Sequence, residues 1–262
     1  MNVLLRYKSL ENLNFGDSRI SNIGCFPNLS ELNWLSLTLG KITHLHPETF
    51  SHLPKLTVLF LNYNQISNIQ SSTFSKLTHL LKLYLNHNNI TYIQSGTFSN
   101  LPCLKCLVLH RNKITKISSS AFLNLPQLQT LYLHFNQITD LQSGTFSDFP
   151  QLQSLFLNHN KISNIQAGTF LNLPKLNHLT LGINQVSTLP PSTYYILVFT
   201  SKVDINFNPW QCDCQMVPFR LLMSGSHSFE HQMRCAQPQN FLGHMLKDIN
   251  PEHLVFMNSS SD

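Results

Sequence analysis

Leucines recur along the chain at a fixed interval. From Leu32 onward, aliphatic residues return at the first, fourth and sixth positions of a unit that repeats every 24 residues, except that Thr200 takes the first position of the last unit. The fourth and sixth positions alternate with variable third, fifth and seventh positions, a period of two that is typical of a short strand with one buried face. The pattern therefore predicts one short strand in each unit.

Two further markers repeat with the same period. Positions are numbered from the first leucine of each unit, and the residues that share a position form a column. Column nine consists of Asn64, Asn88, Asn112, Asn136, Asn160, Asn184 and Asn208. The aromatic residues six positions before each unit are Phe50, Phe74, Phe98, Phe122, Phe146 and Phe170, with Tyr194 last. A buried asparagine needs hydrogen-bond partners, and backbone groups of the adjacent turn and unit are at hand. These asparagines and phenylalanines are therefore expected to support the scaffold.

The consensus L-x-x-L-x-L-x-x-N-x-L resembles the leucine-rich repeat family in its 24-residue extracellular form, over about 200 of the 262 residues. One such unit cannot bury its leucine face alone, so units stack into a continuous core. The resemblance implies an α/β-type solenoid shaped as a horseshoe. It has a concave parallel sheet of about nine short strands, a mostly irregular convex side and a C-terminal cap.

The regular units end before both termini of the chain. An earlier unit begins at Leu10, and Ser18 and Gly40 replace the column-nine asparagine in the first two units, which should therefore be less regular. The predicted divisions are an irregular first repeat acting as an N-terminal cap (1–31), the repeats (32–207), a cysteine-containing C-terminal cap (208–256) and a tail (257–262).

The cap begins with the motif N-P-W-x-C-x-C, which includes Cys212 and Cys214. It resembles the cysteine-rich C-terminal cap of extracellular leucine-rich repeat proteins, and this resemblance implies a disulfide between Cys212 and Cys235. Phe256 stands about where the family has its fourth cysteine, which leaves Cys214 without its usual partner. A disulfide favours an oxidising compartment, so we expect a secreted or cell-surface protein. The glycosylation sequons at Asn28 and Asn89 agree with this location.

Side chains of columns three, five, seven and eight are expected to leave the sheet toward solvent. Column five is rich in phenylalanine and tyrosine, and exposed aromatic residues are enriched at binding interfaces. Cross-strand contacts that stabilise the sheet are the alternative explanation. The candidate ligand-binding residues are Trp34, Val58, Phe60, Lys82, Tyr84, Asn86, Val108, His110, Arg111, Tyr132, His134, Phe156 and Asn158.

Two histidines lie side by side in column seven. Protonation of His110 and His134 is expected to strengthen the binding of anionic ligands as the pH falls toward 6. A metal site formed by this pair, with His87 and Cys106 nearby, is a remote alternative, because no carboxylate is placed to orient either ring.

Catalysis and nucleic-acid binding have little support in the sequence. The motif H-x-E…P-C-x-x-C matches a zinc-deaminase signature, but Cys103 and Cys106 straddle a strand position and point to opposite faces. No other catalytic motif is present, so we expect neither an enzyme nor a cofactor. The net charge is +5, but the 17 Lys and Arg residues form no run of four, which argues against a nucleic-acid surface. No apolar run reaches the ~18 residues of a membrane span, so any anchor is expected outside this chain.

The repeats and cap together resemble the variable lymphocyte receptors of jawless vertebrates and, more distantly, Toll-like receptor ectodomains. This resemblance implies an extracellular immune receptor that binds a microbial surface glycan or a protein antigen on its concave face. An adhesion or signalling ectodomain is the alternative that the sequence leaves open.

Overall fold

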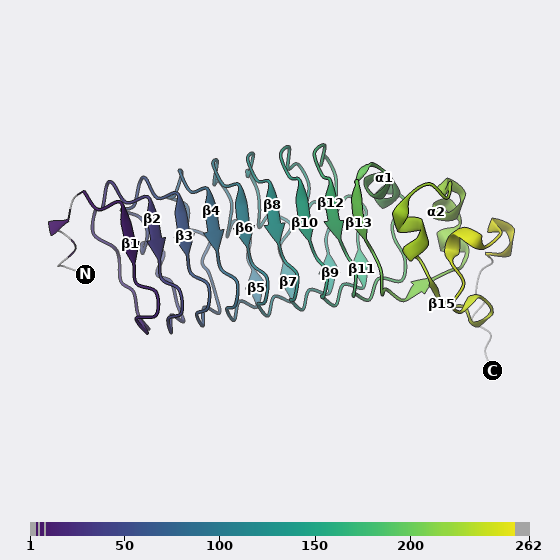
Figure 1. Ribbon diagram of the computed structural model, residues 1–262, viewed down its shortest axis with the longest axis horizontal. Helices are drawn as coiled ribbons and strands as arrows, with labels where there is room; N and C mark the ends of the chain where they lie inside the picture. Colours follow the sequence, from purple (N-terminus) through teal and green to yellow (C-terminus); the bar gives the residue numbers. More distant parts are fainter. Residues whose placement is uncertain (1–3, 5, 8, 255–262) are drawn as a thin grey trace.

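The chain forms a solenoid of stacked units, in a computed structural model that describes residues 4, 6, 7 and 9–254 (Figure 1). One strand from each unit joins a nine-stranded parallel sheet in chain order, which confirms the predicted architecture. Neighbouring strands from the second onward pair residues 24 apart, so column five stays aligned across the sheet. The strands are β1 (Asn12–Asn14), β2 (Trp34–Ser36), β3 (Val58–Phe60), β4 (Lys82–Tyr84), β6 (Cys106–Val108), β8 (Thr130–Tyr132), β10 (Ser154–Phe156), β12 (His178–Thr180) and β13 (Lys202–Asp204).

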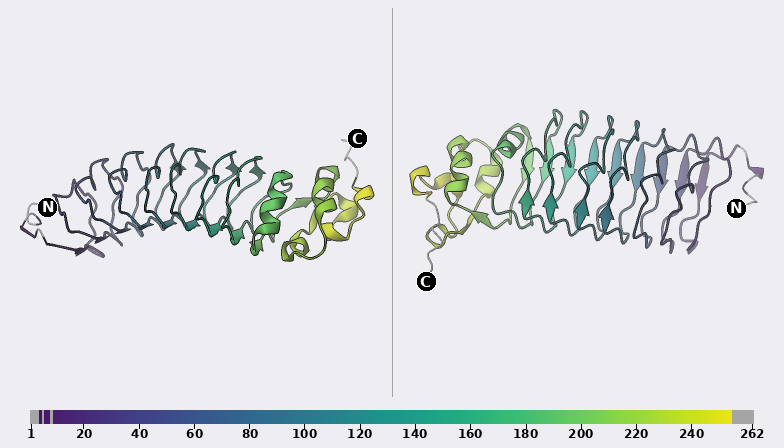
Figure 2. Two further views of the ribbon diagram at one scale, coloured as in Figure 1. Left: turned by 90° about the horizontal axis from the view of Figure 1, so that it is seen from above. Right: turned by 180° about the vertical axis from the view of Figure 1, so that it is seen from behind.

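Regular structure outside this sheet is short. Two small parallel pairs lie away from it, and a third closes the cap. These pairs are β5 (Tyr92–Ile93) with β7 (Lys116–Ile117), β9 (Asp140–Leu141) with β11 (Asn164–Ile165), and β14 (Trp210–Gln211) with β15 (Cys235–Gln237). The helices are α1 (Ser192–Phe199) in the last unit and α2 (Val217–Leu222) in the cap. Figure 2 shows that the solenoid curves gently, with the nine-stranded sheet on the concave side.

The leucines of columns one, four and six fill the space behind the sheet and are almost fully buried. The phenylalanine column closes the opposite side of the core as an unbroken stack, with ring centroids 5.9–6.2 Å apart. This stack includes Phe26, one unit earlier than the sequence pattern indicated. The aromatic core therefore extends into the irregular amino-terminal units.

Column nine fixes the turn that follows each strand. The Asn136 amide donates to the carbonyl oxygens of Leu109 and Leu133, at 3.1 and 3.0 Å, and its oxygen accepts from the N–H of Ile114 at 3.0 Å. Each of these asparagines thus joins two successive units. At Gly40 the ladder has no space for a side chain, since a Cβ there would lie 2.6 Å from Oδ1 of Asn64.

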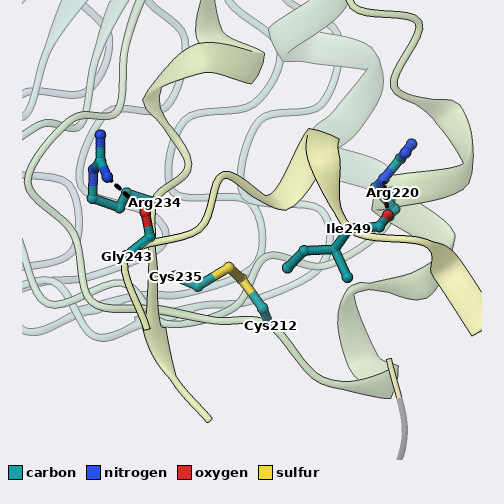
Figure 3. Close-up of a disulfide and its surroundings, with 6 residues drawn as sticks. All are labelled: Cys212, Arg220, Arg234, Cys235, Gly243 and Ile249. Atoms are coloured by element: carbon teal, nitrogen blue, oxygen red, sulfur yellow. Dashed lines mark hydrogen bonds between the residues drawn. A yellow bond between two sulfur atoms is a disulfide. The ribbon is translucent and has the colours of Figure 1, made fainter. Parts of the chain in front are cut away.

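The cap contains the disulfide between Cys212 and Cys235, whose Cα atoms are 5.6 Å apart (Figure 3). Both cysteines are buried, and Cys214 is unpaired within the part of the chain that the structure describes. Two arginines bind the cap backbone around the bridge. Nη1 of Arg234 donates to the carbonyl oxygen of Gly243 at 2.6 Å, and Nε of Arg220 donates to that of Ile249 at 2.7 Å. Phe256, assigned to the position of the missing cysteine, lies outside the described residues, as does the predicted tail.

Among the described residues, the structure contains no helix with the length and apolar character that a bilayer crossing requires.

Candidate functional site

The aromatic residues of column five form two separate stacks on the concave sheet. Phe60 lies flat on Tyr84, with centroids 4.5 Å apart and planes 7° from parallel. Tyr132 lies on Phe156 in the same way, at 4.8 Å and 3°. Val108 stands between the two stacks and is 5% exposed. The expectation that column five faces solvent is therefore wrong at Val108, because its short side chain is buried between the two stacks.

A hollow of about 560 Å³ lies over Val108. Phe60, Tyr84 and Tyr132 form its aromatic sides, and Cys106 lies on the column-three flank. Asn62, Asn86, His110 and His134 line the column-seven flank. The hollow thus combines flat apolar walls with a polar border, the composition typical of small-ligand sites.

The polar border offers hydrogen-bonding groups that the protein does not use. The amide of Asn86 makes no side-chain hydrogen bond within the described ranges, although the residue is only 9% exposed rather than open to solvent as expected. The imidazoles of His110 and His134 stack at 4.5 Å, and their buried Nδ1 atoms have no partner among the described residues. Because these Nδ1 atoms are enclosed by the protein, a ligand in the hollow would pair instead with the Asn86 amide and the exposed edges of the two half-buried imidazoles.

The two histidines are held in the neutral form. Burial lowers the pKa of His110 to about 4, and electrostatic repulsion of its charged form by His134, His87 and Arg111 adds to this shift. Burial also lowers the pKa of His134, with further contributions from Arg111 and His159. The expectation that both rings gain charge as the pH falls toward 6 is therefore wrong for His110, and the lowered pKa of His134 opposes it there as well.

Other ionisable groups at the hollow are also uncharged near neutral pH. Burial raises the pKa of the Cys106 thiol, while nearby Lys82 opposes the shift. Burial raises the pKa values of Tyr84 and Tyr132, with a smaller contribution from Cys106. No carboxylate lines the hollow. Lys82 is exposed at its border, so the local charge favours a neutral or anionic ligand.

Column eight forms a second exposed surface, of which the sequence analysis included only Arg111. Its eight residues all adopt positive φ, between 53° and 58°, a region that bulky side chains rarely occupy. Tyr63 stacks on His87, Phe135 stacks on His159, and the Arg111 guanidinium lies 4.6 Å from the Phe135 centroid. Column eight is Leu39, Tyr63, His87, Arg111, Phe135, His159, Ile183 and Phe207. The signal was available in the sequence, because turn residues such as asparagine or glycine are replaced throughout by large side chains.

The remaining candidates lie around these stacks. Trp34 tilts against Phe60 at 5.4 Å, beside half-buried Val58. Asn158 accepts a hydrogen bond from Thr180 at 2.8 Å, so its carbonyl oxygen is already partnered.

The two predicted glycosylation positions lie outside the sheet. Asn28 is exposed and Asn89 is half-buried. The described ranges contain no group of three His, Cys, Asp or Glu side chains that could hold a metal ion.

The fold and the concave site are those of an interaction scaffold built from repeats. A family model for the leucine-rich repeat matches residues 8–66, 54–114, 103–162 and 150–208. The chain therefore belongs to the leucine-rich repeat family, whose domains are typically non-enzymatic interaction modules. No curated protein matches the chain.

Solved structures of immune and developmental receptors are similar to the chain. Toll in the Toll–Spatzle complex of Drosophila is 27% identical, with a TM-score of 0.73 over 93% of this chain and 35% of that one. TLR13 in complex with ssRNA13 is 29% identical, with a TM-score of 0.51 over 74% of this chain and 32% of that one. The leucine-rich repeat domain of APL1B is 22% identical and shows the fold alone, with a TM-score of 0.64 over 80% of this chain and 58% of that one.

These comparisons limit what is transferred to this chain. It spans only about a third of the Toll and TLR13 chains and 58% of the APL1B chain. The Toll structure is a complex with Spatzle, and the TLR13 structure is a complex with ssRNA13. The sequence-based exclusion of nucleic acid therefore has no support from these neighbours.

Proposed function

We propose that this protein is a non-enzymatic extracellular receptor module that recognises a microbial or antigenic ligand, protein or glycan, on its concave face. The hollow over Val108 carries this proposal, because it combines aromatic walls with a border of amide and imidazole side chains. The scaffold itself requires neither feature. Apolar anchors beside polar groups are the usual composition of an energetically important binding surface.

The location and the neighbours support the same proposal. The buried disulfide in the cap fits an oxidising compartment. The similarity to Toll and TLR13 favours ligand recognition. An adhesion or signalling ectodomain remains the second candidate, because the same hollow would serve a host protein.

The test is a double substitution of the two tyrosines that flank the hollow. Tyr84→Ala with Tyr132→Ala should abolish binding to whichever probe the wild type captures: bacterial cell-wall material, immobilised host surface proteins or single-stranded RNA. Both rings are half-buried, so the loss of stacking should cost only about 1–3 kcal/mol of stability and leave the fold intact. Binding is measured by biolayer interferometry and the fold by circular dichroism.

Tyr92→Ala is the matched control. Tyr92 is also an exposed tyrosine, but it lies on β5, outside the nine-stranded sheet. The Tyr92→Ala variant should bind the captured probe as the wild type does. Normal binding by the folded double variant would exclude the concave site, and capture of host proteins alone would favour the adhesion candidate.

A further inference from the structure

Val108 opens a slot in an otherwise regular aromatic column. Strand β6 pairs with β4 on one side and β8 on the other, so Tyr84 and Tyr132 are both in register with Val108. Because parallel strands lie ~4.8 Å apart, the side chains of Tyr84 and Tyr132 leave the sheet about 9–10 Å apart, centre to centre. The stacks on either side hold each ring parallel to its outer neighbour, so both inner faces point into the slot.

This width selects among groups that could enter. A planar ring in contact with both tyrosines spans only about 7–8 Å between the two tyrosine planes, since carbon atoms pack ~3.5–4.0 Å apart. A nucleobase or an aromatic side chain midway in the slot would lie about 4.8 Å from each tyrosine, as the rings of the existing stacks do, and beyond the close contact distance of carbon atoms. A saturated six-membered ring in a chair conformation is thicker, because its axial C–H bonds project from both faces. It would contact both tyrosines at once.

The border of the slot distinguishes a sugar from an aliphatic side chain. The amide of Asn86 and the exposed edge of the half-buried His110 imidazole lie on one flank, and the Cys106 thiol lies on the other. A branched aliphatic group would fill the width and leave these polar groups without partners, which is unfavourable. A pyranose ring has C–H bonds on its faces and hydroxyl groups around its edge, so it matches both the walls and the border.

We propose that the slot between Tyr84 and Tyr132, with Val108 as its floor, holds one pyranose ring of a glycan ligand. The inference rests on the proposed function and specifies its ligand class. Each tyrosine stacks on one face of the sugar, and its hydroxyl groups bond with Asn86 and His110. The hollow of about 560 Å³ also accommodates adjoining sugars along the column-seven flank. With exposed Lys82 at the border and no carboxylate in the lining, neutral and acidic sugars are accepted and cationic ones are disfavoured.

The experiment fills the slot with the type of residue that neighbouring units already carry. Val108→Phe completes the aromatic column, because the new ring fits between Tyr84 and Tyr132 at the stacking distances observed on either side. The wild-type protein is titrated with oligosaccharides built from glucose, galactose, mannose, N-acetylglucosamine and glucuronic acid. Isothermal calorimetry and saturation-transfer NMR follow the binding. At least one of these probes should bind, and Val108→Phe should weaken it at least tenfold.

Thr180→Phe is the matched control. Thr180 shares column five with Val108 but lies beyond Phe156, so a ring there leaves the slot open. It should bind the same oligosaccharide within twofold of the wild type. Thermal melting checks that each variant is folded. If Val108→Phe does not fold, Tyr132→Leu replaces it and should cause a similar loss, since it removes one wall.

Two outcomes overturn the proposal. The first is the absence of oligosaccharide binding by the wild-type protein, and the second is unchanged binding by the folded slot variant. A protein probe that binds the concave face and is lost in the double tyrosine variant, with no oligosaccharide bound, would uphold the proposed function while overturning the sugar assignment. The experiment therefore distinguishes failure of the sugar assignment from failure of the proposed function.

Discussion

His110 and His134 show how a residue's neighbours set its charge. Each ring is partly buried against the other ring and lies close to Arg111, so accepting a proton would place a second cation beside the guanidinium in a partly desolvated site. Other units carry asparagine at the same column, as at Asn62 and Asn86. The histidines thus act as neutral hydrogen-bonding rings near physiological pH.

This pKa shift predicts a loss of stability in mild acid. An unfolded histidine takes up a proton near pH 6.5, while folded His110 does so only near pH 4. Between these values the unfolded state binds more protons, so the free energy of unfolding falls as the pH decreases through this window. In His110→Asn with His134→Asn this fall should be smaller, as measured by urea titrations from pH 7.5 to 4.

His52→Asn is the control, because His52 is exposed and far from the sheet. Its pH profile should follow that of the wild type. Parallel profiles for the wild type and the double histidine variant would show that burial does not shift these pKa values.

At the scale of one repeat, the asparagine ladder determines how units join. Asn136 is 7% exposed and makes three well-formed hydrogen bonds to backbone groups of its own and the preceding units. Asn136→Ala leaves those groups buried without partners, so it should cost about 1–3 kcal/mol of stability. Thermal or urea unfolding measures the loss.

Asn164→Ala provides the comparison, because Asn164 is exposed on β11 and makes only a 3.5 Å contact with Asp140. It should change stability by less than about 0.5 kcal/mol. Equal effects of the two substitutions would contradict the structural role of the ladder.

The same scale shows what the sequence could predict. A strict 24-residue period determines the register of the strands, so the sheet and the buried leucines follow from the pattern alone. Phe26 also obeys the period and could have been included. The burial of Val108 could not be predicted, because it depends on how far Tyr84 and Tyr132 rise above it. The neutral histidines were missed for a related reason, since their charge depends on the packed geometry of several units.

At the scale of the whole molecule, one disulfide, between Cys212 and Cys235, cross-links the carboxyl-terminal cap among the described residues. The cap covers the last repeat, and the carbonyl oxygen of Val203 on β13 accepts a hydrogen bond from Gln232 of the cap at 3.0 Å. The bridge closes a loop of 23 residues between Cys212 and Cys235. Loops of this length gain about 3 kcal/mol from such a bond.

Removal of the bridge should therefore loosen the solenoid from this end. In a solenoid each unit contacts only its neighbours, so damage at a cap spreads inward from it. Cys212→Ala with Cys235→Ala should cost about 2–5 kcal/mol and speed amide exchange first in β13 and β12. Hydrogen exchange with mass spectrometry resolves the order.

Cys214→Ser serves as the control, since Cys214 forms no disulfide within the described chain. Its exchange pattern should match the wild type. If amide exchange became uniformly faster across all units in the double alanine variant, the prediction that exchange speeds up first in β13 and β12 would be wrong.

The exact registration of column five has a consequence for how such a surface changes over generations. Each unit contributes one side chain to the column, so a single substitution alters the width of the gap by one strand spacing and leaves the rest of the row unmoved. Duplication or loss of a whole 24-residue unit would likewise add or remove one column-five side chain, while the other side chains of the column stay in register. The side chains of the concave face can thus change one position at a time, while the leucine core beneath them stays the same.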